Sequence, residues 1–397
     1  MVDFMGEARA AFDTVVSCRR ALHQCPELSG QEVHTSERVA STLESFGIQV
    51  QRGVGTPYLG VTGVLTGGRP GPTVALRADM DALPVTEVKD LPYRSQIPGV
   101  MHACGHDAHM AMLLGAAQLL AEHREELAGN VKFIFEPNEE REGGALSMIA
   151  DGALDGVDAI FGLHVDPEFP TGTIVTKPGA VMASSDWLTI DLCGESTHGG
   201  YPHRGVDAIV IAGEFLSAVQ SLVSRNLDPT ESAVITFGSI HGGTARNVIC
   251  GQVRLEGILR ALDPEVRRYL LDRIQGMLEG ITKAYGGTFR FHRRDSQTVT
   301  QNTPSMASFV KQTAKEVLGE TAFLPLPTAR LRSEPFARYL ERVPGAYYFL
   351  GTGNPKKDTQ HPWHSAEFDI DEEAMVYGTA MQAALAYRYL QQGSAPR

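Results

Sequence analysis

Short apolar runs alternate with amphipathic segments over the first 180 residues. Residues 34–47 form an amphipathic pattern and residues 106–122 (HDAHMAMLLGAAQLLAE) are rich in alanine and leucine, so both predict helices. The runs at 73–77 (TVALR), 131–135 (VKFIF) and 158–165 (DAIFGLHV) predict short buried strands. Helices that alternate with strands in this way are typical of an α/β layer in which the helices cover a sheet.

The order of predicted elements changes between about residue 185 and residue 293. Strands are predicted at 187–193, 233–240, 248–259 and 287–292, and helices at 205–225 and 264–284. The resulting order, β-α-β-β-α-β, is that of a ferredoxin-like unit. The α/β pattern then resumes with a helix at 304–318, an apolar strand at 346–351 and a helix at 371–391.

These patterns predict two domains, which also suits a chain of 397 residues, because a single core of that size is unusual. We expect a catalytic α/β domain, with a mixed central sheet flanked by helices, to be built from residues 1–184 and 294–397. A ferredoxin-like α+β domain at 185–293 interrupts it. We find no internal repeat.

Composition narrows the class of protein. The formal net charge is -12 and no basic run is present, which argues against a nucleic-acid partner. No stretch approaches about 18 uninterrupted apolar residues, so we expect no membrane span. The N-terminus has no apolar region typical of a secretory signal, and the five cysteines are scattered and odd in number. A reducing, cytoplasmic location is therefore expected.

Metal-binding and acid–base residue types gather in five segments of the α/β portion. These segments are ALRADMDALP (75–84), MHACGHDAH (101–109), FEPNEE (135–140), GLHV (162–165) and HPWHSAEFD (361–369). In four of the five, a strand-like run precedes or approaches the polar cluster. Ligands collect at strand ends in open α/β sheets, so these segments are predicted to converge.

In the segment MHACGHDAH, Cys104 and His106 are two residues apart, a spacing that would place them on different sides of a helix. They share a centre only if this part is a loop that leads into the helix. Gly105 permits such a turn, and Asp107 suits the first turn of the helix that follows. A lone cysteine is usually a small buried apolar residue. The three histidines and the aspartate within nine residues favour a ligand role for Cys104.

Glu139 and Glu140 follow the strand VKFIF and Pro137. Paired glutamates are usually a solvated surface feature. Adjacent residues of an extended segment point in opposite directions, so here one carboxylate can bind a metal while the other faces a bound water. A metal hydrolase needs this arrangement of a ligand beside a general base.

The remaining candidates are weak when taken one at a time. His164 ends an apolar strand, where a polar group needs a partner, and a lone histidine there is more often part of the core. His364 lies in a polar loop and alone indicates little. Asp79 and Asp81 follow the strand TVALR and suit a supporting role, orienting a histidine or the general base.

The number of candidate ligands favours two metal ions over one. The candidates are Cys104, His106, Glu140, His164 and His364. A tetrahedral zinc takes four ligands and a catalytic zinc usually three, so five suit a pair of ions that share a bridging thiolate. Such a pair would lower the pKa of a bound water, with Glu139 moving the proton to the leaving amine. Zinc, cobalt, nickel and manganese all suit mixed sulfur, nitrogen and oxygen donors.

With these motifs the chain resembles the M20 metallopeptidase family. Within that family it is similar to the subfamily of aminoacylases, hippurate hydrolases and auxin-conjugate hydrolases. The resemblance runs from RRALHQCPELSGQE (19–32) to HSAEFDIDEE (364–373), and MHACGHDAH together with RADMDALP is highly specific for the subfamily. It implies that the five candidates are ligands, that Glu139 is the general base and that Asp81 supports it.

The resemblance also implies that the inserted domain is a lid and a dimerisation domain. In HGGYPH (198–203), His198 would be an oxyanion donor that acts within its own chain or from a neighbouring subunit. Asn247 in GGTARN and Arg260 in EGILR would hold the substrate carboxylate, for which an arginine fork is suited. Without the resemblance, Arg260 would be interpreted as a solvated charge at the end of a strand.

Several positions depart from the family pattern while the ligands and the base are kept. The departures are Glu136, Asn138, Cys250, Gly251, Ile258 and Pro335. We expect them near the path of the substrate, which leaves the preferred substrate open.

The sequence thus predicts a hydrolase of N-acyl-L-amino acids, such as N-acetyl or N-benzoyl derivatives, that forms a homodimer or a higher homo-oligomer through the lid. A dipeptidase or carboxypeptidase of the same family, and a non-catalytic protein that binds metal or amino acids, are the alternatives.

Overall fold

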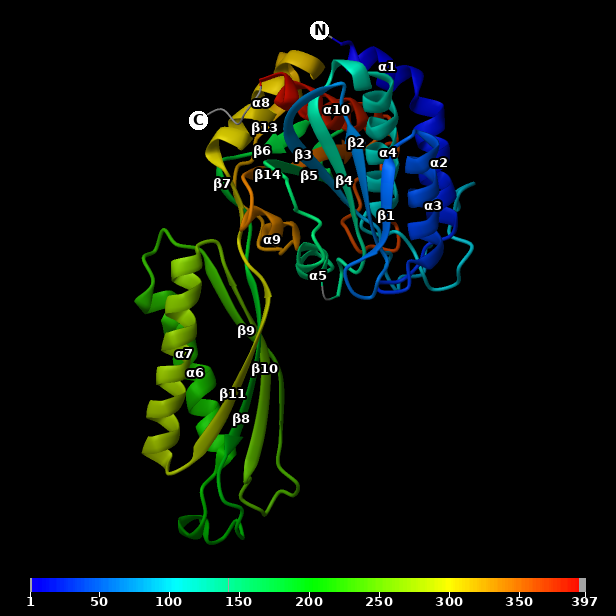
Figure 1. The fold of residues 1–397 in the computed structure, drawn as a ribbon. Helices are drawn as coiled ribbons and strands as arrows, with labels where there is room; N and C mark the ends of the chain where they lie inside the picture. The colour runs from blue at the N-terminus through cyan, green and yellow to red at the C-terminus, as the bar shows by residue number, and fades with distance from the viewer. Residues whose placement is uncertain (1, 142, 393–397) are drawn as a thin grey trace. The chain divides into compact units, whose positions relative to one another are not determined.

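The computed structural model describes residues 2–141 and 143–392, and the chain forms two compact units (Figure 1). Unit 1 comprises residues 1–181, 301–327 and 335–397, and unit 2 comprises residues 182–300 and 328–334. Unit 2 is therefore an insertion in the sequence of unit 1. It extends beyond residue 293 because its last strand continues to Gln297, paired along its whole length with the first strand of the unit.

An eight-stranded mixed sheet forms the centre of unit 1. In spatial order its strands are β1 (Gln49–Val54), β2 (Gly60–Thr66), β4 (Ala128–Glu136), β3 (Arg69–Asp79), β5 (Ala159–Pro170), β14 (Gly345–Gly353), β6 (Ile174–Thr176) and β13 (Phe323–Pro325). The four strands β4, β3, β5 and β14 run parallel to one another. Their central residues are wholly buried, which explains the unbroken apolar runs in the sequence. A separate pair is formed by β7 (Gly179–Met182) and β12 (Thr300–Asn302).

Helices cover both faces of this sheet. The longer ones are α1 (Phe4–Ala10), α2 (Phe12–Gln24), α3 (Val33–Ser45), α4 (His106–Glu122), α8 (Pro304–Leu318) and α10 (Ala374–Gln392), and the short ones are α5 (Ala145–Ala150), α9 (Phe336–Leu340), η1 (Arg124–Glu126) and η3 (Glu320–Ala322). Phe161 of β5 contacts rings of α8 and α10, whereas a side chain at the next position, Gly162, would meet Phe336 of α9. Successive strand residues point to opposite faces, so α8 and α10 cover one face and α9 the other.

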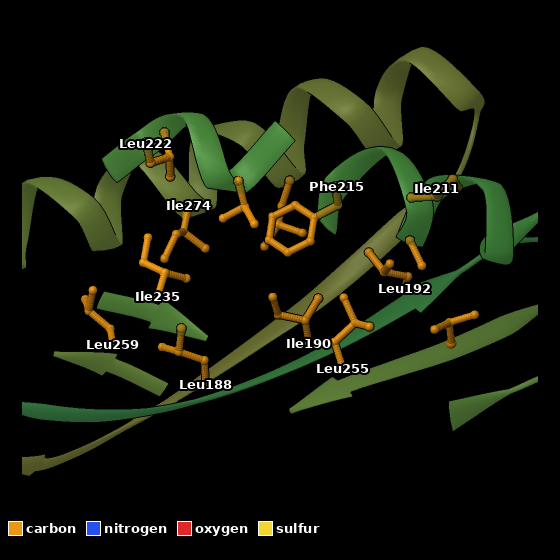
Figure 2. Packing of buried hydrophobic residues seen from close by; sticks show 14 of the residues in the cluster. Leu188, Ile190, Leu192, Ile211, Phe215, Leu222, Ile235, Leu255, Leu259 and Ile274 are labelled. Atoms are coloured by element: carbon orange, nitrogen blue, oxygen red, sulfur yellow. The ribbon is translucent and has the colours of Figure 1, made fainter. Parts of the chain in front are cut away.

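Unit 2 has the ferredoxin-like topology. Along the chain it contains β8 (Ser185–Cys193), η2 (Pro202–Arg204), α6 (Ala208–Asn226), β9 (Ala233–Gly242), β10 (Gln252–Ala261), α7 (Pro264–Tyr285) and β11 (Thr288–Gln297). The spatial order of the strands is β11-β8-β10-β9, with antiparallel pairing throughout. Leucine, isoleucine and phenylalanine side chains from α6, α7 and the sheet fill the space between them (Figure 2). The predicted fold class, a mixed α/β sheet flanked by helices with an inserted ferredoxin-like unit, is confirmed.

One helix among the described residues, α6, is long and apolar enough to cross a membrane by length and composition alone. Its buried residues, Ala208, Ile211, Ala212, Phe215, Val219 and Leu222, recur at helical spacing. They belong to the core between the helices and the sheet of unit 2. The apolar content of α6 is therefore explained by its place in that core.

Candidate functional site

Four neighbouring parallel strands of unit 1 bring the predicted polar segments to one edge of the sheet. Asp79 is the last residue of β3 and Glu136 the last residue of β4, and the two are paired in register. His164 lies in β5, and the loop that carries His364 follows β14, the strand paired with β5. Carboxyl ends of adjacent parallel strands share an edge, so segments far apart in the sequence meet there as predicted.

The loop before α4 places Cys104 and His106 together. The helix begins at His106, so the two residues are on a turn instead of a helix face, as the sequence predicts. Gly105 between them has a φ of 89°, in the left-handed region. A Cβ at this position would also lie 2.4 Å from the Cγ2 atom of Val165, so only glycine allows this close approach to β5.

Two groups of three candidate ligands share the Cys104 sulfur. In one group the other members are His106 and His164, and in the second they are Glu140 and His364. Within each group, the donor atoms lie within 4.8 Å of one another. The Cys104 Sγ atom is 3.4 Å from Nε2 of His164, and Nε2 of His364 is 3.2 Å from Oε1 of Glu140. These two sets, which share one sulfur, are the residues that would hold a pair of ions.

His106 has the environment of a metal ligand. Its side chain is buried, and its Nε2 atom has no hydrogen-bond partner among residues 2–141 and 143–392. The nearest carboxylate oxygens, from Asp79 and Glu140, lie 3.7 and 3.9 Å from that nitrogen, beyond hydrogen-bond distance. A buried nitrogen without a partner is costly, and a cation bound between these groups would satisfy it.

The electrostatics of the cluster also favour cations. Burial alone would lower the pKa of His106, but the Asp79 and Asp81 carboxylates raise it to about 10. Burial raises the pKa of the Cys104 thiol, and Glu140 adds to the rise. Nearby carboxylates thus raise both pKa values: they outweigh the effect of burial at His106 and add to it at Cys104. Divalent cations would neutralise this charge and deprotonate the thiol.

Asp81 fixes the turn that carries the two glutamates. Its carboxylate accepts the backbone N–H groups of Glu139 and Glu140 at 3.1 and 3.0 Å, and the hydroxyl of Ser29 at 2.6 Å. Its Oδ1 atom is also 3.3 Å from Nδ1 of His106. Asp81 therefore contacts both the turn that carries the candidate base and the candidate ligand His106.

The prediction that Glu139 and Glu140 lie in an extended segment is wrong. They lie in a turn, because Asn138 before them has a φ of 59° and the chain reverses there. Asparagine tolerates the left-handed region better than most residues, which gives this departure from the family pattern a backbone reason. The two carboxylates converge with His106 within 4.8 Å instead of pointing in opposite directions.

Glu136, expected near the path of the substrate, is instead wholly buried. Its carboxylate pairs with Arg77, at 2.9 Å from Nε and 2.8 Å from Nη2, and accepts the backbone N–H of Ala145. Arg77 also lies 2.7 Å from Asp79 through Nη1. Arg77 therefore compensates the negative charge of Glu136 in the interior of unit 1.

His109 is a supporting residue that sequence reasoning left unassigned. Its Nδ1 atom lies 2.6 Å from Asp79, and its Nε2 atom accepts the backbone N–H of Val165 at 3.0 Å. Asp79 and His109 thus support the residue next to His164. Its position three residues after His106, on the same side of α4, could have indicated this supporting role from the sequence.

The other departures have local structural roles. Pro335 is the N-cap of α9 with a φ of −59°, which suits proline. A Cβ on Gly251 would lie 2.5 Å from the Ser196 hydroxyl oxygen, and the Cys250 thiol donates to the Gln252 carbonyl. Ile258 lies within β10, opposite Trp187 and Thr236.

The candidate substrate-binding residues all lie in unit 2 but at two different places. His198 and Asn247 are exposed on loops, joined by a hydrogen bond from the Gly199 N–H to the Asn247 carbonyl at 2.7 Å. Arg260 is eight residues beyond Gln252, the first residue of β10, or roughly 26 Å at the rise of a strand. The structure therefore brings His198 and Asn247 together but leaves Arg260 at the opposite end of the sheet. Burial lowers the pKa of Arg260.

Comparisons with known proteins agree with the geometry of unit 1. The model of peptidase family M20/M25/M40 matches residues 75–388. The chain is 39% identical over 380 residues to thermostable carboxypeptidase 2 of Saccharolobus solfataricus, a match that covers 95% of each protein. It is 39% identical over 365 residues to N-acetyl-L-cysteine deacetylase of Bacillus subtilis, covering 91% of this chain and 85% of that protein.

A solved structure shows the same fold over nearly the whole chain. A dinuclear metal binding peptidase from the M20 family of Bacillus subtilis matches with a TM-score of 0.86 and 34% sequence identity. The match covers 96% of this chain and 99% of that one.

Proposed function

This chain belongs to peptidase family M20/M25/M40, and on that premise we propose that it hydrolyses N-acyl-L-amino acids to a carboxylate and a free amino acid. The resemblance seen in the sequence is confirmed, and the chain is a metal-dependent amidohydrolase of this family. One observation carries the proposed chemistry. Two groups of three ligand-type residues share Cys104, and the Glu139 carboxylate lies within 4.8 Å of the donors of His106 and Glu140.

The proposed roles follow from these positions. Cys104, His106, Glu140, His164 and His364 would hold two divalent metal ions. When bound, the ions would lower the pKa of a bound water and stabilise negative charge on the amide oxygen. Glu139 would accept the proton from water and deliver it to the leaving amine. Asp81 would keep Glu139 in place through the two backbone N–H groups of its turn.

Unit 2 would supply the groups that recognise the substrate. We assign an oxyanion donor to His198 and carboxylate binding to Asn247 and Arg260. Because Asn247 lies on the loop before β10 and Arg260 lies near the far end of that strand, one small carboxylate does not reach both within a single chain. This favours a homo-oligomer in which His198 and Asn247 serve the metal centre of a second copy. Closure of unit 2 as a lid would exclude water and strengthen the electrostatics of the centre.

The relatives support the substrate class and also define its rival. A deacetylase of an N-acetyl amino acid is 39% identical to the chain, which favours acyl amino acids. A thermostable carboxypeptidase is also 39% identical, which favours a peptide substrate with a free carboxyl end. All five cysteines are free thiols, in keeping with our proposal of a reducing, cytoplasmic location.

A substrate panel with a defined metal content separates these possibilities. It pairs N-acetyl and N-benzoyl groups with several amino acids, and includes dipeptides and acyl amino acids whose carboxyl group is amidated. We expect kcat/KM for the best acyl amino acid to exceed that for any dipeptide at least about tenfold. Amidation of the carboxyl group of that acyl amino acid should lower kcat/KM by a similar factor. Faster turnover of dipeptides would replace the proposal by its rival. The absence of turnover for every member would favour a non-catalytic binding protein.

A further inference from the structure

The N-terminal motif RRALHQCPELSGQE (19–32) contains neither a candidate ligand nor the candidate base. Its first residues belong to α2, where Arg19 and His23 lie one turn apart on the same face. Both side chains are buried, with 0% and 1% of their surface exposed. A wholly buried arginine is rare unless its charge and its N–H donors are matched. The groups that surround these two side chains must therefore explain why they are buried.

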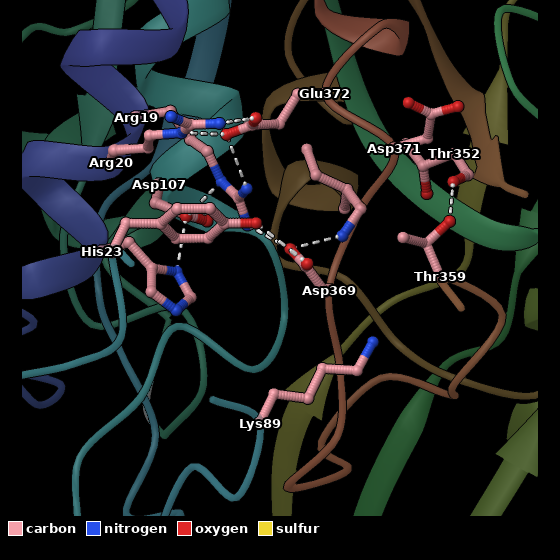
Figure 3. Close-up of polar contacts among 12 residues, drawn as sticks. Arg19, Arg20, His23, Lys89, Asp107, Thr352, Thr359, Asp369, Asp371 and Glu372 are labelled. Atoms are coloured by element: carbon pink, nitrogen blue, oxygen red, sulfur yellow. Dashed lines mark hydrogen bonds and ion pairs between the residues drawn. The ribbon is translucent and has the colours of Figure 1, made fainter. Parts of the chain in front are cut away.

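Arg19 donates to carboxylates from two segments that are far apart in the sequence (Figure 3). Its Nε atom lies 2.9 Å from Oδ2 of Asp107, and Nη2 lies 2.8 Å from Oδ1 of Asp369. Its Nη1 atom lies 3.1 Å from Oε1 of Glu372. One guanidinium thus joins the first turn of α4 to the loop before α10. Figure 3 shows these carboxylates grouped around the Arg19 side chain.

His23 adds a third segment to the same group. Its Nδ1 atom lies 2.8 Å from Oδ2 of Asp107, and its Nε2 atom lies 3.3 Å from Oε1 of Glu87. Glu87 is on the segment that follows β3, and it accepts the backbone N–H of Ser95. We call these six residues the Arg19 network: Arg19, His23, Glu87, Asp107, Asp369 and Glu372.

The carboxylates of the Arg19 network lie on the segments that carry the candidate metal centre. Asp107 directly follows His106, and Asp369 is five residues after His364. The same two segments are also joined by a backbone hydrogen bond, from the His364 N–H to the Ala103 carbonyl at 2.8 Å. A charged side-chain link and a backbone link therefore fix the same two ligand loops against each other.

We propose that Arg19 and His23 are positioning residues of the metal centre, which hold the loops of His106 and His364 at the separation that two ions require. The proposal rests on the proposed function. Metal ligands need supporting contacts because a displacement of about half an ångström weakens a site. Neither residue contacts a candidate ligand directly, so each acts through a carboxylate.

The alternative is that these residues only attach α2 to the rest of unit 1. Arg20 provides a matched control for that alternative, because it is the next residue of the same helix. It binds Glu372, a member of the network, through Nε at 2.9 Å and Nη2 at 2.6 Å. Its side chain is 45% exposed, and the carboxylates of Asp107 and Asp369 are not among its partners.

The experiment compares Arg19→Lys, His23→Gln and Arg20→Lys with the wild type, all as the full chain. Lysine keeps the charge at position 19 but lacks the planar fork that three carboxylates require. Three readouts are taken: Co²⁺ affinity by competition with a chelator, the visible absorption of the Co²⁺-loaded protein, and kcat and KM at saturating Co²⁺. Thermal melts of the metal-free proteins report whether each variant folds.

We expect Arg19→Lys to bind at least one Co²⁺ about tenfold more weakly, with shifted absorption bands and a lower kcat at nearly unchanged KM. His23→Gln should show a smaller change in the same direction, and Arg20→Lys should stay within about twofold of the wild type. If Arg19→Lys does not fold, His23→Gln decides the matter. Affinity and spectra of Arg19→Lys and His23→Gln equal to those of Arg20→Lys would overturn the proposal. A wild type that binds Co²⁺ but hydrolyses no acyl amino acid would contradict the proposed function alone.

Discussion

The candidate metal centre in unit 1 and the candidate substrate residues in unit 2 differ in how the fold treats them. In unit 1, the residues come from distant segments, converge within 4.8 Å in overlapping groups, and are supported by buried carboxylates. In unit 2, His198 and Asn247 are exposed on loops, and Arg260 lies at the other end of β10.

This difference indicates which part of the proposed reaction, metal binding or substrate recognition, a single unit can support by itself. Unit 1 by itself brings together the candidate metal ligands and the candidate base. Unit 2 presents its candidate substrate residues at two separate places, so their proposed role in recognition would require an arrangement beyond the single unit. Changes in unit 1 should therefore alter metal binding and kcat, and changes in unit 2 should be sensitive to assembly.

The largest expected effect is the loss of metal, which tests the unit 1 side of the comparison. Removal of divalent ions by a chelator should abolish hydrolysis, by about 1000-fold or more, because the proposed ions lower the pKa of the attacking water. Adding Zn²⁺, Co²⁺, Ni²⁺ or Mn²⁺ should restore it. Elemental analysis should find two ions per active chain. Full activity in a preparation shown to be metal-free would remove the two-metal proposal.

The next effect tests whether unit 2 acts across subunits. His198→Ala should lower kcat about 100-fold to 1000-fold, as expected for the loss of an oxyanion donor. Glu139→Gln should be inactive by itself. If His198 serves a second copy, mixing the two inactive variants should recover up to about a quarter of wild-type activity, because each mixed dimer has one intact site.

The control for this mixture is a chain that carries both substitutions, mixed with each single variant. No activity should return in that case, since no intact pair can form. Failure of the single variants to complement each other, in a protein shown to exchange subunits, would mean that His198 acts in its own chain or has no role.

A smaller effect concerns stability and the Arg19 network. Burial lowers the pKa of His23, but Asp107 and Glu87 outweigh it and raise the pKa to about 9. The unfolded value is about 6.5, so protonated His23 should stabilise the fold fully below pH 6.5. That contribution, of the order of 3 kcal/mol, should be lost as the pH rises through 9. The measurement is urea unfolding of the wild type and of His23→Gln between pH 6 and 10.

The other groups that face His23 do not obscure this window. Arg19 stays charged, since its neighbouring carboxylates raise its pKa further. Burial lowers the pKa of His102 to about 4, and burial raises the pKa of Tyr93 well above the window. A stability difference between wild type and His23→Gln that does not change between pH 6 and 10 would contradict this account.

Apolar periodicity predicted most of the fold because most of the helices and strands bury a face made of apolar side chains. Helices α4 and α8 have the predicted bounds, 106–122 and 304–318. By contrast, α2 was not predicted, and its buried face shows why. That face includes Arg19 and His23, and a buried charge looks like an exposed one in a hydrophobic pattern.

The sequence predicted which residues form the candidate site better than it predicted how they are arranged. The sequence indicated the residues of the metal centre, because several ligand types in short segments narrow the chemistry. It did not reveal the turn at Glu139, which depends on the left-handed backbone of Asn138. The shared carboxylate that the resemblance implies for Asn247 and Arg260 stays a proposal, but the sequence did not reveal that the length of β10 separates the two residues within one chain.

The most direct test of the central claim is Glu139→Gln in a preparation with defined metal content. We expect this variant still to bind two ions per chain, since the five proposed ligands remain. Its kcat for the best acyl amino acid should fall by about 1000-fold or more, because the proton of the water is no longer accepted. A variant that binds two ions and hydrolyses this substrate at the wild-type rate would contradict the account.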